Sequence, residues 1–181
     1  MRILNFTKSQ KREELFLKVI NKIGPIAGIT VAILPFALYL HSRQPQKLPI
    51  GASFTINNQT IQLEVAREPQ ELYKGLKFRT VLPPNHGMLF VVNKPEVISL
   101  WMKDTYVHLD MIFLKDGEIK NIVRKAPPCT TKECPAYSSK YPVNQIIELP
   151  AGSADSLGLD VSKSIKISAK SRITAVVYKL M

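Results

Sequence analysis

The stretch LDMIFLKDGEIKNIVRK, residues 109–125, decides the fold class because it joins two apolar-rich runs through a turn signal. The dipeptide Asp116-Gly117 between the runs is typical of a two-residue β-hairpin loop. Outward from this hairpin, strand-like runs recur at residues 53–57, 60–66, 88–92, 97–102, 144–150, 164–170 and 172–180, with short helical patterns at 68–78 and 152–159. The pattern predicts a mainly β fold, a compact antiparallel sheet that curls into a small barrel with two short helices.

The amino-terminal part of the chain separates charged from apolar residues. Residues 1–22 carry six of the 25 basic residues, whereas residues 23–40 carry no charge. A helix over this uncharged run would rise about 27 Å, close to the thickness of the hydrocarbon core of a membrane. We therefore expect one transmembrane helix over residues 23–40, with the membrane as its partner. A cleaved signal peptide is the alternative, although the run offers no small-x-small cleavage site.

The charges around this run set the expected topology. Six basic residues precede it and only Arg43 and Lys47 follow closely, so the positive-inside rule places residues 1–22 in the cytoplasm. Residues 41–52 would then be a linker. Residues 53–181 would form a single β-rich domain on the non-cytoplasmic side, in a periplasm, lumen or extracellular space. The remaining basic residues form no aromatic-interleaved stripe, so we expect no nucleic acid as a partner.

Cys129 and Cys134 are the only cysteines of the chain. In an oxidising compartment a bridge between them would close a tight loop, and we predict this disulfide. A redox-active pair would need the two-residue spacing that the sequence lacks, and two free thiols are the remaining alternative. Two thiols without a nearby histidine do not complete a zinc site, so we expect no metal and no cofactor.

Several separate motifs occur in one order along the chain. They are GLKFR at 75–79, GMLF at 87–90, LWMKDT at 100–105, LD at 109–110, Pro-Cys and Cys-Pro at 128–129 and 134–135, and IELPAG at 147–152. Over residues 54–168 the chain thereby resembles the domain-of-unknown-function 192 family. The resemblance implies a small β-rich domain, often exported behind a signal or anchor, without an established activity. The chain departs from the family pattern at Lys77, where Met is usual, at His108, where Pro is usual, and at Ser162-Lys163, where Gly-Asp is common.

Polar residues enter segments that are otherwise built for burial, and buried polar groups must find partners. Five residues of these motifs are candidate ligand-binding residues: Arg79, Trp101, Lys103, Thr105 and Asp110. We expect them to converge, with Trp101 as an apolar wall and the others as polar groups around a ligand. The alternative is architectural: Asp110 caps a turn or pairs with Lys103, and Trp101 is a core aromatic.

These candidates predict a membrane-anchored, exported domain that binds a small molecule, and the sequence leans against an enzyme. An envelope assembly or protein-interaction domain is the alternative, and it would use an exposed apolar patch or a sheet edge. A hydrolase with Asp110 and Glu148 as a carboxylate pair is less favoured. Nothing in the sequence fixes the separation of the two carboxylates, and Glu148 is expected to face solvent from its strand.

Overall fold

The computed structural model describes residues 8–170, and within its first helix the side chains of residues 8–11 and 23–32 lie outside the description. The chain divides into two compact units, Met1–Gln44 and Pro45–Met181. In the first unit, the described residues form one long helix, α1 (Lys8–Ser42). The strand predicted at residues 172–180 falls outside the described part of the chain.

The predicted transmembrane helix needs correction. Across residues 8–170, no helix combines the length and the apolar character that crossing a membrane requires. The uncharged run is not an element of its own, because α1 begins in the charged segment at Lys8 and carries Arg12, Lys18 and Lys22 on the same continuous helix. The fold therefore does not include the separate membrane-spanning helix that we expected over residues 23–40.

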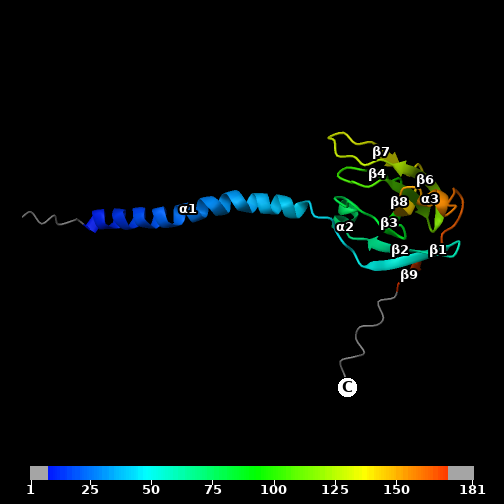
Figure 1. Ribbon diagram of the computed structural model, residues 1–181, viewed down its shortest axis with the longest axis horizontal. Helices are drawn as coiled ribbons and strands as arrows, with labels where there is room; N and C mark the ends of the chain where they lie inside the picture. The colour runs from blue at the N-terminus through cyan, green and yellow to red at the C-terminus, as the bar shows by residue number, and fades with distance from the viewer. Residues whose placement is uncertain (1–7, 171–181) are drawn as a thin grey trace, which may run out of the picture. The chain divides into compact units, whose positions relative to one another are not determined.

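The second unit is built on one seven-stranded sheet with the strand order β6-β5-β8-β3-β2-β1-β9 (Figure 1). Its strands are β1 (Ile50–Ile56), β2 (Gln59–Ala66), β3 (His86–Glu96), β5 (Leu109–Lys115), β6 (Glu118–Ala126), β8 (Val143–Pro150) and β9 (Ser168–Ala169). All neighbouring pairs are antiparallel except β2 and β3, which run parallel. The parallel pair requires a crossover, and it contains the short helix α2 (Pro69–Lys74).

The expected barrel is wrong, because the sheet stays open. Its edge strands are β6 and β9, and β9 contributes only two residues, which pair with β1. Closure of a barrel would need the two edges to pair with each other along their length. In addition, the predicted strand at residues 97–102 does not join the sheet: β4 (Ser99–Trp101) pairs with β7 (Ala136–Ser138) in a separate ribbon.

Turn chemistry explains the two tight hairpins of the sheet. Asp116 and Gly117 connect β5 to β6 with φ of 50° and 84°. Asn57 and Asn58 connect β1 to β2 with φ of 49° and 60°. Positive φ at both central residues matches the right-handed twist of the flanking strands, and Asn, Asp and Gly tolerate it best. Both hairpins expected from the sequence are therefore confirmed.

The sheet is apolar on both faces, since alternate residues of its central strands enter two different clusters. One cluster includes Ile112, Leu149 and residues at and just after the short helix α3 (Ser153–Ser156), and we call this side the α3 face. The other cluster includes Met88, Met111 and Leu76, which follows α2, and we call this side the α2 face. Because each strand residue points to one face only, the face decides which polar side chains can meet.

Candidate functional site

A buried ion pair lies on the α2 face. Glu64 projects from β2, and Arg79 follows α2 in the crossover to β3. The Arg79 guanidinium donates through Nη1 to Oε1 and through Nη2 to Oε2 of Glu64, both at 2.6 Å. The two side chains are only 11% and 12% exposed. This two-point geometry is the strongest form of arginine–carboxylate pairing, and it fixes the plane of both groups.

The segment just before β1 completes the surroundings of this ion pair. Arg79 Nη2 also donates to the Gln46 carbonyl at 2.6 Å, and the Leu48 amide donates to Glu64 Oε2 at 2.7 Å. The Gln46 side chain in turn donates to the carbonyls of Glu71 and Gly75 at 2.8 and 3.0 Å. Residues 46–48, expected within a linker, therefore belong to the packed part of the second unit.

A pocket of about 510 Å³ opens beside the Glu64–Arg79 pair, and we call it the Arg79 pocket. It is lined by Pro45, Lys47, Leu48, Glu64, Phe78, Arg79, Thr80, Val81, Pro83 and His86. Two buried nitrogen atoms of its lining residues, Arg79 Nε and His86 Nδ1, have no hydrogen-bond partner within residues 8–170. Buried polar atoms are rarely left unpaired in folded proteins. The pocket thus combines apolar walls with the polar side chains of Glu64, Arg79 and His86.

Glu148 lies on the same face but in the centre of the sheet. It pairs with Met88 of β3 on one side and with Met111 of β5 on the other, and Glu64 flanks Met88 from β2. Only 7% of Glu148 is exposed, contrary to the solvent-facing position expected from the sequence. Burial raises the pKa of its carboxyl group to about 7, because desolvation disfavours the charged form.

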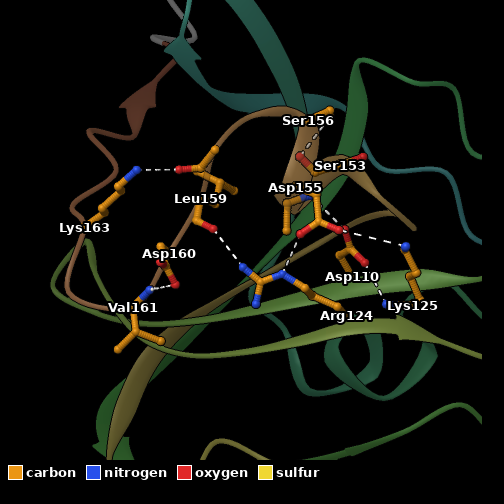
Figure 2. Close-up of polar contacts among 12 residues, drawn as sticks. Asp110, Arg124, Lys125, Ser153, Asp155, Ser156, Leu159, Asp160, Val161 and Lys163 are labelled. Carbon is orange, nitrogen blue, oxygen red and sulfur yellow. Dashed lines mark hydrogen bonds and ion pairs between the residues drawn. The ribbon is translucent and has the colours of Figure 1, made fainter.

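Asp110 has a different environment, on the opposite side of the sheet. It is fully buried, and its two carboxylate oxygens accept from the backbone amides of Lys125 and Ala154, each at 2.8 Å (Figure 2). Lys125 has a φ of 54° and lies in a bulge of β6, where two residues face the single residue Asp110. Ala154 lies in the first turn of α3. Asp110 therefore ties a bulge to a helix, in line with the architectural alternative.

The bulge also carries side chains toward α3. Arg124 Nε donates to Asp155 Oδ1 at 2.8 Å, and its Nη2 donates to the Leu159 carbonyl at 3.0 Å (Figure 2). Lys125 Nζ lies 4.0 Å from Asp155 Oδ2. Because the side chains of Arg124, Lys125 and Asp155 are exposed, their ion pairs add little stability individually and mainly orient the segment after α3.

Lys103 and Thr105 lie beside the cysteine loop. Cys129 and Cys134 form a disulfide with Cα atoms 5.9 Å apart, as the sequence predicts. The backbones of Lys103 and Thr105 both bridge to Cys129, and Lys103 Nζ donates to the Thr131 carbonyl at 2.6 Å. Thr105 is buried at this junction. The loop therefore fixes the segment that follows β4.

Trp101 ends β4 with 55% of its surface exposed, so it is not a core aromatic. Its ring lies 5.7 Å from the Lys77 ammonium, and that ammonium also lies 3.6 Å from the centroid of the Tyr73 ring. The structure thus gives Trp101 a cationic and aromatic neighbourhood at the surface, separate from the residues that line the Arg79 pocket.

The structure does not bring the five sequence-predicted residues into one cluster. Arg79 lines the pocket, Trp101 is exposed, and Lys103 and Thr105 contact the disulfide loop. No ion pair joins Lys103 to Asp110 in the part of the chain that the structure describes, since each has other partners. Nor do the described side chains of His, Cys, Asp and Glu form a group of three that could hold a metal ion.

Sequence reasoning missed two members of the Arg79 pocket, Glu64 and His86. Glu64 occupies a polar position in the alternating run of β2, which is typical of a solvent-facing residue. Its burial depends on the crossover and on residues 46–48, which fold over that side of the strand. His86 directly precedes the GMLF motif at the start of β3, and its position in the motif region is the only sequence signal that could have indicated it.

Comparisons with known proteins agree with the fold. One solved structure, a "putative transcription regulator" from Sinorhizobium meliloti 1021, is 31% identical and covers 65% of this chain and 91% of its own, with a TM-score of 0.56. A protein of unknown function from Novosphingobium aromaticivorans DSM 12444 is 30% identical and covers 65% of this chain and 83% of its own, with a TM-score of 0.57. No curated protein matches the chain.

The family comparison covers the same region as the sheet. Residues 52–167 match the family model DUF192, described as "Uncharacterized ACR". This range includes Glu64, Arg79 and His86 of the Arg79 pocket as well as both cysteines. The chain belongs to the DUF192 family.

Proposed function

We propose that the second unit is a small-molecule binding module and that its ligand occupies the Arg79 pocket. The observation that carries this proposal is one pocket of about 510 Å³ in which the Glu64–Arg79 ion pair and His86 lie beside apolar side chains. Ligand sites typically have this volume, with apolar walls and a few convergent polar groups.

The chemistry of the lining residues restricts the ligand class. The Arg79 guanidinium carries only N–H donors, so a ligand that contacts it needs an acceptor oxygen or nitrogen. The charge of Arg79 is already compensated by Glu64 at 2.6 Å, which favours a polar group over a highly charged one. Leu48, Phe78 and Val81 offer contact to an apolar portion. A small, partly apolar molecule with one or two hydrogen-bonding groups fits these demands.

The geometry favours binding over the carboxylate-pair hydrolysis considered from the sequence. Asp110 pairs with Leu149 and Glu148 with Met111 in the register of β5 and β8, so the two carboxylates project from opposite faces of the sheet. They cannot act on one bond. Both oxygens of Asp110 are moreover occupied by backbone amides.

Mass spectrometry of small molecules released from the purified full-length protein tests the proposal. We expect one compound near a one-to-one ratio, lost in His86→Phe, which removes the ring nitrogens and keeps an aromatic ring. His108→Phe is the matched control, since His108 is exposed and does not line the pocket. Loss of the compound in both variants, or no retained compound in the wild type, would refute ligand binding in the pocket.

We further propose that the second unit resides in an oxidising, non-cytoplasmic compartment. The Cys129–Cys134 pair supports this, because stable disulfides are rare in reducing compartments. Alkylation of cells with a thiol reagent before lysis, followed by intact-mass analysis, tests the compartment. Unmodified cysteines are expected without reductant, and two alkylated cysteines would contradict the proposal.

A further inference from the structure

Lys77 is a largely buried residue whose ammonium has no carboxylate partner within residues 8–170. Only 8% of the residue is exposed, and within residues 8–170 its Nζ has no ion-pair or hydrogen-bond partner. The ammonium instead lies 3.6 Å from the Tyr73 ring centroid and 5.7 Å from that of Trp101. Lys77 follows α2, Tyr73 is within α2, and Trp101 ends β4, so three separate positions of the fold meet at this ammonium.

The Lys77 ammonium still reaches solvent, because it is not among the buried polar atoms without a partner in the described part of the chain. An ammonium is strongly hydrated, and the loss of part of its water without a counter-charge is costly. Two aromatic faces offset part of this cost through cation–π attraction. They do not satisfy the three N–H donors, which a carboxylate would accept.

The Tyr73 and Trp101 rings offer apolar surface for the uncharged part of a ligand. Tyr73 is 72% exposed and Trp101 is 55% exposed, so both present aromatic surface to solvent beside the ammonium. The other charged residues within three positions of Tyr73, Lys77 or Trp101 comprise three basic and two acidic residues: Lys74, Arg79, Lys103, Glu71 and Asp104. A ligand with a carboxylate and a flat apolar face would place the acid on Lys77 and its flat face on a ring.

We propose that Tyr73, Lys77 and Trp101 form a binding site for a small organic carboxylate with a flat apolar face, such as an aromatic acid or a sugar acid. None of these three residues lines the Arg79 pocket, so the site is independent of the proposed function of that pocket. The carboxylate accepts from Lys77 Nζ, and the rest of the ligand stacks on Trp101 or Tyr73.

Trp101 is the only tryptophan of the chain, so its fluorescence reports on this site directly. The full-length protein is titrated with benzoate and with glucuronate, and with the neutral analogues benzamide and glucose. We expect a saturable change with at least one of the acids and none with its neutral analogue. Saturation by benzoate alone identifies aromatic acids as the ligand class, and saturation by glucuronate alone identifies sugar acids.

Three variants complete the test. Lys77→Met keeps the length of the side chain but removes the charge, and it should weaken the response to the acid by about tenfold or more, the equivalent of one charge-assisted hydrogen bond. Tyr73→Leu changes an exposed side chain that the fold does not need, and it should weaken binding as well. Lys166→Met is the matched control, because Lys166 is exposed between two residues that pack on the opposite, α3 face.

Binding by folded Lys77→Met and Tyr73→Leu at wild-type affinity would overturn the proposal. So would the absence of a saturable response of the wild-type protein to both acids. An equal loss in Lys166→Met would also overturn it, since the effect would then come from net charge rather than from the site.

Discussion

At the scale of single residues, the most informative side chain is Glu148, a carboxyl group in the middle of a sheet. Its pKa is raised by burial from 4.5 to about 7. At pH values between 4.5 and about 7, the Glu148 carboxyl group is ionised in the unfolded chain but protonated in the folded protein. The free energy of unfolding must therefore fall as the pH rises through this window, by about 1.4 kcal/mol per pH unit and about 3 kcal/mol in total.

Glu148→Gln tests this directly, because the amide cannot ionise. We expect the variant to lose the downward slope between pH 4.5 and 7 and to be more stable than the wild type at pH 8. Denaturant unfolding over this pH range measures both effects. Glu96→Gln, on an exposed residue of β3, is the control and should keep the wild-type slope.

Asp110 gives a second prediction at the residue scale. Asp110→Ala leaves the amides of Lys125 and Ala154 without their acceptor, so we expect a loss of about 2–4 kcal/mol in the free energy of unfolding. Asp160→Ala removes an exposed carboxylate whose one hydrogen bond within residues 8–170 comes from the Val161 amide, and it should cost about 0.5 kcal/mol or less. Equal effects of the two changes would show that Asp110 does not hold the bulge to α3.

At the scale of elements, the Glu64–Arg79 pair joins β2, the crossover and residues 46–48. Arg79→Met leaves a buried carboxylate, so it should destabilise the protein by about 3–5 kcal/mol. The double variant Glu64→Leu with Arg79→Met removes both charges, and it should recover most of that stability while losing the retained ligand. If the double variant is as unstable as the single one, the pair is needed for packing rather than as a charge pair.

The disulfide loop holds the segment after β4 through backbone hydrogen bonds. The Asp104 amide donates to the Cys129 carbonyl at 2.9 Å, and the Phe78 amide donates to the Asp104 carbonyl at 2.8 Å. Replacing both cysteines with serine should lower the free energy of unfolding by about 2 kcal/mol. Hydrogen exchange should become faster at Asp104 and Phe78, whereas unchanged protection there would show that the loop does not support this segment.

The elements also show what the sequence could predict. The hairpins at Asn57-Asn58 and Asp116-Gly117 were predictable because their turn chemistry is local. The open sheet was not, since closure depends on which distant strands pair, and apolar runs carry no such information. Only part of the Arg79 pocket was predictable. Arg79 itself lies in a recognisable motif. Its partner Glu64 is distant in sequence, and the crossover between the parallel strands β2 and β3 brings the two residues together.

At the scale of the whole molecule, the chain consists of two compact units that divide after Gln44. All contacts described here for the sheet, the Arg79 pocket and the disulfide lie within the second unit. A chain that begins at Pro45 should therefore fold by itself, with the thermal midpoint of the sheet within a few degrees of that in the full-length protein. Calorimetry of both chains checks this, and an unfolded shorter chain would show that the first unit is required.

Ligand binding in the Arg79 pocket is tested most directly by a crystal structure of the full-length protein purified without added ligands. We predict density for a non-protein molecule in the Arg79 pocket, in contact with Arg79 or His86. A pocket that holds only water would contradict small-molecule binding as the function of this domain.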